Sequence, residues 1–231
     1  MNILVLMAHA DDAAFFCAGT LAKYKAAGHK IYIAVATGTE EPWGAAALAA
    51  ETRLLGFKED VVRDDMIARP AVLTAMRWAD ADVIITHAPW DADGDHAIVS
   101  KLAMDSLLIV GGKLHPADLP PIVKQPNLFY VDTKAGSVLE NRYTQKNTKT
   151  TDQTFYLTPG VYSNDWAEPE AYTDITDFAE QKFAALQKDE KLVALAQAQS
   201  RLRGMQMGVG YAEAFSGLRM NGHVADYRLL P

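Results

Sequence analysis

The sequence predicts an α/β protein with a Rossmann-like, doubly wound and mostly parallel sheet. Residues 2–8 (NILVLMA) form a short, continuously apolar run, which is typical of a strand buried on both faces of a sheet. Residues 17–27 are helix formers that end before Gly28, and 30–36 (KIYIAVA) is again a β-branched and aromatic run. A strand, a helix and a second strand in close succession make a βαβ unit, which implies a parallel sheet with a right-handed crossover.

The same alternation of apolar runs and helix-forming segments continues to about residue 135. We expect strands at 2–8, 30–36, 59–64, 82–87 and 127–133, and helices at 17–27, 44–55, 70–80 and 96–110. Pro70 suits the first turn of a helix, and Gly56 follows the predicted end of another. In the common strand order 3-2-1-4-5, ligands bind in the crevice between the first and fourth strands, beyond their carboxyl ends.

The C-terminal part of the chain is less regular. Residues 134–170 predict loops with a small appended strand pair around TFYLTPGVY, and 174–204 predict one or two helices. No clear linker interrupts the sequence, so we expect a single domain over 1–231. In this prediction 1–135 form the Rossmann-like core, and 136–231 form an irregular, partly helical elaboration that completes the pocket.

Composition and charge exclude several classes of function. The chain of 231 residues is 49% hydrophobic and has a net charge of −7, so it is a folded protein without a basic field for nucleic acid or an anionic membrane. Cys17 is the only cysteine, which excludes an intrachain disulfide and a cysteine-rich zinc site. The N-terminal apolar run is broken at His9 and no basic segment precedes it. We therefore expect neither a signal peptide nor a membrane span, and a cytoplasmic location. The sequence is compatible with a homo-oligomer.

The densest polar segments follow the first and fourth predicted strands. His9, Asp11 and Asp12 come directly after the first strand. The segment after the fourth strand, THAPWDADGDHA, contains His87, Asp91, Asp93, Asp95 and His96. A catalytic zinc site commonly takes two imidazoles and a carboxylate and keeps one position open for water. His9, one early aspartate and one histidine of the second segment would supply this set. The other early aspartate would then act as general base on the metal-bound water.

Helix capping is the alternative interpretation of the same aspartates. Asp11 or Asp12 could cap the helix that follows them, and Asp95 could cap a helix that begins at His96. Spacing alone does not favour the metal site over the caps.

Three further side chains are candidates for the wall of a substrate pocket. They are His87, Trp43 and Trp90, although burial in the core is the common alternative for a tryptophan. A nucleotide cofactor is disfavoured, because no phosphate-binding glycines follow the first strand.

Several segments resemble the PIG-L (LmbE-like) family of metal-dependent de-N-acetylases. Residues 8–37 (AHADDAAFFCAGTLAKYKAAGHKIYIAVAT) are similar to the opening of that family, and 89–96 (PWDADGDH) are similar to its second motif. The late segments 172–186 and 203–215 are similar to it as well.

The resemblance implies a ligand set and a reaction. It assigns metal ligation to His9, Asp12 and His96, and makes Asp11 the general base. The implied cofactor is Zn²⁺, with Fe²⁺ or another divalent ion as an alternative. The implied reaction is hydrolysis of an amide in a small N-acetylated substrate, namely an amino sugar such as N-acetylglucosamine or its glycoside.

The chain departs from the family pattern at three positions. Ala10 stands where the motif has proline, and Ala13 where it has glutamate. Asp93 stands where the family usually has a histidine that stabilises the oxyanion, and an ionised carboxylate there would repel the developing charge. We count Asp93 as a catalytic candidate together with Asp11 and with Asp95, which is expected to orient a neighbouring imidazole. The alternative function is therefore a family member that acts on a different amide or binds without catalysis.

Overall fold

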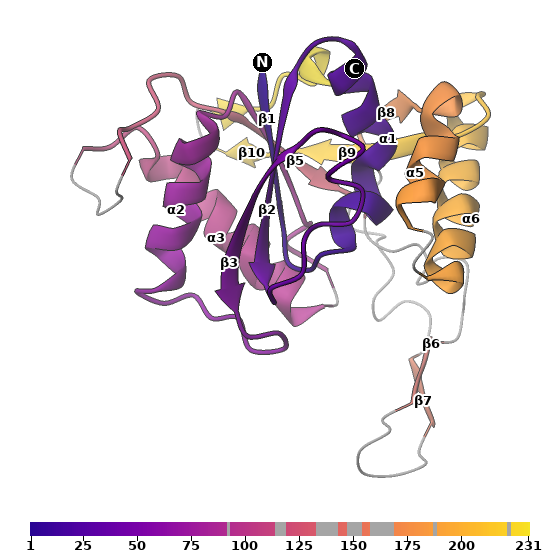
Figure 1. Ribbon diagram of the computed structural model, residues 1–231, viewed down its shortest axis with the longest axis horizontal. Coiled ribbons are helices and arrows are strands. Elements are labelled where there is room, and N and C mark those ends of the chain that lie inside the picture. Colours follow the sequence, from indigo (N-terminus) through magenta and orange to yellow (C-terminus); the bar gives the residue numbers. More distant parts are fainter. Residues whose placement is uncertain are drawn as a thin grey trace.

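The computed structural model describes residues 1–91, 93–113, 119–132, 143–146, 154–157, 169–186, 189–220 and 223–231. A seven-stranded sheet lies at its centre, in the order β3-β2-β1-β4-β5-β9-β8 (Figure 1). Its strands are β1 (Asn2–Met7), β2 (Lys30–Thr37), β3 (Glu51–Phe57), β4 (Val83–Thr86), β5 (Asn127–Val131), β8 (Ala171–Asp174) and β9 (Ala212–Gly217). The first five strands are parallel, whereas β9 runs antiparallel to β5 and β8 antiparallel to β9. The predicted fold class and the order 3-2-1-4-5 are confirmed.

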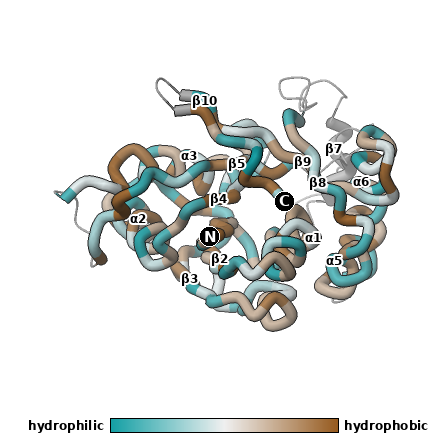
Figure 2. The backbone as a smooth tube through the Cα atoms, turned by 90° about the horizontal axis from the view of Figure 1, so that it is seen from above, coloured by the Kyte–Doolittle hydropathy of each residue, from teal (hydrophilic) through white to brown (hydrophobic). Residues whose placement is uncertain are grey.

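Helices cover both faces of this sheet. They are α1 (Asp12–Ala26), α2 (Ala68–Ala79), α3 (Gly94–Ile109), α5 (Ala179–Ala185) and α6 (Glu190–Met207), with short 3₁₀ turns η1 (Thr176–Phe178) and η2 (Tyr227–Leu229). Figures 1 and 2 show α2 and α3 on one side of the strands and α1, α5 and α6 on the other. None of the helices among the described residues is long and apolar enough to cross a membrane.

The side chains of β1 explain why the sheet is covered twice. Ile3, Val5 and Met7 point into the core layer shared with α1, while Leu4 and Leu6 point into the layer shared with α2 and α3. All five are fully buried. Alternate residues of a strand face opposite sides of a sheet, so a strand with no polar residue on either face needs cover on both.

The helix predicted over 44–55 is wrong. Residues 44–49 form turns, and 51–57 form β3, which pairs with β2 along the edge of the sheet. The alanines of this segment favour a helix, but Ala49 takes a left-handed conformation (φ 46°) that ends the turns. Pairing with β2 therefore overrides local helix propensity. The strand predicted at 59–64 does not form. The other helices and strands predicted before residue 135 are confirmed with shifted ends; α1 begins earlier than expected.

The C-terminal part extends the same sheet. The helices predicted over 174–204 are η1, α5 and α6. The expected strand pair is present as β6 (Tyr143–Lys146) and β7 (Thr154–Leu157), and the rest of 134–168 lies outside the described residues. The sequence did not predict β8, β9, β10 (Arg219–Met220) or β11 (His223–Val224). That this part completes the pocket stays a prediction.

Candidate active site

The two predicted polar segments meet at the carboxyl edge of the sheet. Leu6 of β1 is the register partner of Thr86 of β4, so the chain leaves both strands at the same level. Beyond that level, the backbone N–H of Ala8 donates to Nε2 of His87 at 2.9 Å. The two polar segments that the sequence singled out therefore lie next to each other beyond the ends of β1 and β4.

Neither early aspartate caps α1. Asp11 occupies the N-cap position, but its side chain makes no capping hydrogen bond. Oδ2 of Asp12 accepts from the backbone N–H of His9 at 2.7 Å, outside the helix. Since capping was the alternative explanation for these two carboxylates, its absence leaves both available for other roles.

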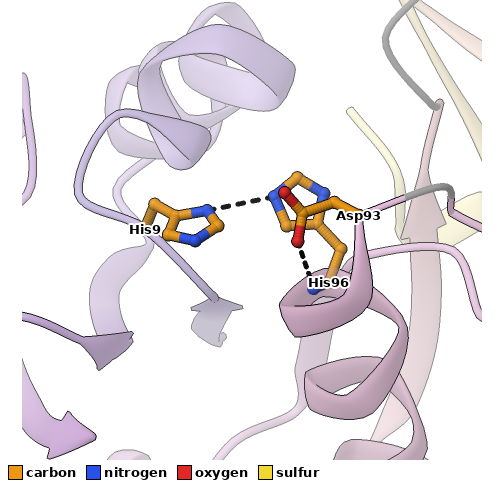
Figure 3. Close-up of side chains that lie close together, drawn as sticks. All are labelled: His9, Asp93 and His96. Atoms are coloured by element: carbon orange, nitrogen blue, oxygen red, sulfur yellow. Dashed lines mark hydrogen bonds between the residues drawn. The ribbon is translucent and has the colours of Figure 1, made fainter. Parts of the chain in front are cut away.

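Three donor atoms converge at the start of α1 and α3. Oδ2 of Asp12 lies 3.4 Å from Nδ1 of His9 and 3.4 Å from Nε2 of His96. Those two nitrogens lie 3.2 Å apart, as the dashed line in Figure 3 marks. Zinc bonds to nitrogen and oxygen are about 2.0–2.1 Å long, which gives about 3.3 Å between two ligands of a tetrahedron. The triangle therefore has the dimensions of one tetrahedral face.

The hydrogen bonds around the triangle also suit a metal ion. Nδ1 of His96 lies 3.0 Å from Oδ2 of Asp91 and donates to it, which leaves Nε2 facing Asp12 and His9. Oδ1 of Asp12 is buried without a hydrogen-bond partner among the described residues. A buried carboxylate oxygen without a donor is costly, and a cation bound beside it would remove that cost. The residues present thus fit a divalent ion.

The titration of the cluster reflects its negative charge. Burial lowers the pKa of His96, but the hydrogen bonds and charges of Asp12 and Asp91 outweigh burial and raise it to about 10. Burial works to raise the pKa of Asp12, yet the surrounding imidazoles hold it well below its usual value. In the metal-free protein the cluster therefore keeps a proton on His96, in a place where the same field would attract a metal ion.

Asp93, not Asp95, caps α3. Oδ1 of Asp93 accepts from the backbone N–H groups of Asp95 and His96 at 2.9 and 3.3 Å, and α3 begins at Gly94 rather than at His96. Figure 3 shows the Asp93 carboxylate next to the His96 side chain, with one oxygen joined by a dashed line to the backbone nitrogen of His96. Asp93, His9 and His96 also form a group close enough to share a metal ion. Asp93 thus fixes the helix that carries His96 and remains exposed beside it.

Asp95 links His9 to a neighbouring loop. Its Oδ2 lies 3.6 Å from Nε2 of His9 and accepts from the backbone N–H of Asp60 at 2.7 Å. Its Oδ1 accepts from the N–H of Val62 at 3.1 Å. The backbone of Asp60 is left-handed (φ 65°), a conformation uncommon for residues other than glycine, and the carboxylate of Asp95 stabilises this turn.

The three residues predicted for the pocket wall lie in different environments. His87 is fully buried and stacks on His96, with ring centroids 3.7 Å apart, and it forms with Asp12 and His96 a second group close enough to share a metal ion. Trp43 is half-buried, and its backbone N–H donates to the carbonyl of Ala10 at 2.8 Å. Trp90 is 41% exposed and packs edge-on against Tyr130. Trp43 is therefore joined to the first polar segment by a hydrogen bond, and Trp90 belongs to the second.

Two contacts of the site lacked a role in the sequence analysis. Asp91 orients His96 through a hydrogen bond to Nδ1. Its place five residues before His96, in the turn that leads into α3, was the available signal. The ring of Phe16 packs edge-on against His87 and His96, at centroid distances of 5.7 and 6.1 Å. Its place in the first turns of α1, close to Asp12, was the available signal.

The N-terminal part of the chain is similar to a known protein family. Residues 4–54 match the PIG-L family model, described as GlcNAc-PI de-N-acetylase. The resemblance of this region to the PIG-L family is thereby confirmed, and the matched range contains His9, Asp11 and Asp12. No curated protein matches the chain.

Solved structures share the fold over nearly the whole chain. GalB, the 4-carboxy-2-hydroxymuconate hydratase from Pseudomonas putida, is 16% identical with a TM-score of 0.72, and the match covers 95% of this chain and 97% of that one. The conserved protein TT1542 from Thermus thermophilus is 23% identical with a TM-score of 0.72, covering 96% and 99%. The N,N'-diacetylchitobiose deacetylase from Pyrococcus horikoshii is 16% identical with a TM-score of 0.70, covering 94% and 83%. One fold thus occurs in a hydratase and in a deacetylase, so function has to be argued from the site.

Proposed function

We propose that the protein is a metal-dependent amide hydrolase that removes an N-acetyl group from an amino sugar or its glycoside. The observation that carries the proposal is the triangle of His9 Nδ1, Asp12 Oδ2 and His96 Nε2; Asp11 precedes Asp12 in the chain. The family match supports amide hydrolysis, since that model describes a de-N-acetylase. The fold shared with the deacetylase from Pyrococcus horikoshii is consistent with it.

His9, Asp12 and His96 would hold the ion, and Zn²⁺ suits two imidazoles and one carboxylate. A divalent ion bound there would lower the pKa of a water molecule and polarise the amide carbonyl. The rings are oriented from outside the triangle, because Asp91 accepts from His96 and Asp95 lies beside Nε2 of His9. Carboxylates in such positions fix the ring orientation and raise the basicity of a metal-binding imidazole.

Asp11 would act as the general base. Its side chain is partly exposed, and no described residue donates a hydrogen bond to it. A carboxylate in this state can accept a proton from the attacking water and pass it to the leaving amine. The neighbouring Asp12 cannot share that role, because its Oδ2 is surrounded by three imidazole nitrogens at 3.2 to 3.4 Å.

Asp93 determines which amide the site favours in this proposal. Its Oδ1 is used for capping α3, while the carboxylate lies close to His9 and His96, where its charge would act on a bound substrate. That charge disfavours an anionic group at the same place and favours a hydroxyl or cationic group. The alternative function, a protein that keeps the metal and binds without catalysis, rests on the same residue.

The test is acetate release by the zinc-loaded full chain. The substrates are N-acetylglucosamine, N,N'-diacetylchitobiose and simple glycosides of both, and the variants are His9→Ala and Asp93→His. We expect wild-type activity that His9→Ala abolishes together with bound zinc. Wild-type protein that binds no divalent ion would refute the proposal. Bound zinc without acetate release, combined with activity gained in Asp93→His, would establish the binding-protein alternative.

A further inference from the structure

A buried ion pair lies beside α1, away from the proposed metal ligands. Lys182 of α5 and Glu213 of β9 are 2% and 3% exposed, and Nζ lies 2.6 Å from Oε1. Burial of two charges is expensive, and a pair in a protein core is weak evidence for added stability. The position of this pair is therefore more informative than its energy.

The pair is bonded to the backbone in the middle of α1. Nζ of Lys182 donates to the carbonyl of Phe15 at 2.5 Å. The N–H groups of Gly19 and Thr20 donate to the two oxygens of Glu213 at 3.1 and 2.8 Å. In an uninterrupted α-helix the N–H of residue 19 bonds to the carbonyl of residue 15. Here the carbonyl of Phe15 and the N–H of Gly19 each bond to a charged side chain from another element.

A helix can bend where a side chain enters its hydrogen-bond ladder, so bonds made at that point bear on the turns on either side. The turn on the N-terminal side begins at Asp12, and the N–H of Phe15 bonds to the carbonyl of Asp11 at 2.9 Å. The next residue, Phe16, packs edge-on against His87 and His96. One turn of helix thus carries the expected carboxylate ligand and the ring that contacts the stacked imidazoles.

Gly19 brings the pair and the helix together. A Cβ atom at this position would lie 2.8 Å from side-chain atoms of Ile175, at the start of η1. The absent side chain lets α1 approach the segment that leads into α5, so that Lys182 can reach the carbonyl of Phe15.

We propose that Lys182 and Glu213 are positioning residues, which hold the first turn of α1 so that Asp12 and Phe16 meet His96 in the metal-binding geometry. This inference rests on the proposed function for its metal. Neither residue touches the triangle, so they act through the backbone of α1. Loss of the pair would let the first turn move relative to α3, and the triangle would lose its dimensions.

The experiment compares Lys182→Met with Arg77→Met in the full chain. Arg77 is a matched control, because it is also a buried cation that donates to backbone carbonyls. It bonds to Val110 and Gly112 at 3.1 and 2.7 Å, at the C-terminal end of α3, opposite the end that carries His96. Both variants are expected to lower the free energy of unfolding, since each leaves buried polar groups without a partner.

Only Lys182→Met is expected to weaken zinc binding. Partners outside the ligand set typically change metal affinity by about 10–100-fold, so we expect its zinc dissociation constant to rise at least about tenfold. Arg77→Met should stay within about threefold of wild type. Glu213→Gln keeps the side-chain shape and one acceptor for α1, and we expect a smaller change in the same direction.

A second measurement does not need the metal. In long-range ¹H–¹⁵N spectra of the zinc-free protein, the imidazole signals of His87 and His96 should shift in Lys182→Met and in Glu213→Gln, but not in Arg77→Met. If Lys182→Met does not fold, the zinc affinity and the imidazole signals of Glu213→Gln decide.

The inference is overturned if wild-type affinity and unchanged imidazole signals are found in the two pair variants, or if Arg77→Met reproduces the changes. Wild-type protein without any zinc affinity would refute the proposed function, and the spectra of the zinc-free protein would then decide whether the pair positions the histidines.

Discussion

Adjacent aspartates with separate roles give a sharp test of the site, because Asp11→Asn and Asp12→Asn are chemically the same change one residue apart. Asp12 is fully buried, and its Oδ2 faces three imidazole nitrogens within 3.4 Å. Asp12→Asn removes one of the three proposed ligands, which should weaken zinc binding by at least about 100-fold. That change corresponds to about 3 kcal/mol at about 1.4 kcal/mol per tenfold.

Asp12→Asn should also destabilise the zinc-free protein by about 3–5 kcal/mol, because His96 loses a buried charge partner. Asp11 is partly exposed and accepts no hydrogen bond from a described residue. Asp11→Asn should therefore change the free energy of unfolding by less than about 0.5 kcal/mol and leave zinc affinity unchanged. It should lower kcat by about 10²–10⁴-fold, the usual contribution of a general base.

Zinc affinity is measured by competition with a chromophoric chelator, stability by urea denaturation of the zinc-free proteins, and turnover by acetate release. If Asp11→Asn loses zinc while Asp12→Asn retains it, the two roles are assigned the wrong way round. If both variants lose zinc to the same extent, the separation of base and ligand that the geometry suggests is refuted.

Three further predictions concern stability. The pKa of His96 in the folded, zinc-free protein is raised from 6.5 to about 10, so its contribution is complete below pH 6.5 and is lost as the pH rises through 10. The free energy of unfolding should fall by up to about 1.4 kcal/mol per pH unit in that window, and His96→Gln should flatten the profile; an unchanged slope in His96→Gln contradicts the assignment. Asp93→Ala should lower the free energy of unfolding by about 1 kcal/mol, because α3 loses its cap. Asp93→Asn keeps a capping oxygen and should keep the melting temperature. A change of kcat in Asp93→Asn would therefore reveal a role of the Asp93 charge in the reaction. Gly19→Ala should lower stability by about 1–3 kcal/mol because its Cβ would lie 2.8 Å from Ile175, while a urea midpoint above wild type would show that helix propensity prevails over packing.

The sequence was most informative where one pattern decides one structure. The continuously apolar runs that became β1 and β4 indicated strands covered on both faces, and the common strand order 3-2-1-4-5 placed their carboxyl ends side by side. That reasoning placed His9 near the histidines of the second polar segment, and the resemblance to the PIG-L family singled out His96, which is 87 residues away in the chain.

Features that depend on the path of the chain between elements could not be predicted in this way. The segment at 44–55 has the alanines of a helix, yet β2 offered an unpaired edge that 51–57 fill. Asp93 rather than Asp95 caps α3 because the helix begins at Gly94, a shift of two residues that composition does not reveal. Strands β8 and β9 are short and carry charged residues, which makes them hard to recognise in the sequence. Glu213 of β9 is buried, and it pairs there with Lys182 of α5.

The place of β9 in the sheet has a consequence for synthesis. All the expected metal ligands lie within the first 96 residues, whereas the contact between Gly19 and Glu213 spans 194 residues. A chain that emerges from the ribosome N-terminus first therefore exposes the open edge of β5 until β9 arrives to pair with it. Pairing over such a sequence separation is slow, because loop closure is costly before the contact forms. The cluster of histidines and aspartates is thus present in the nascent chain well before the strand that fixes its helix.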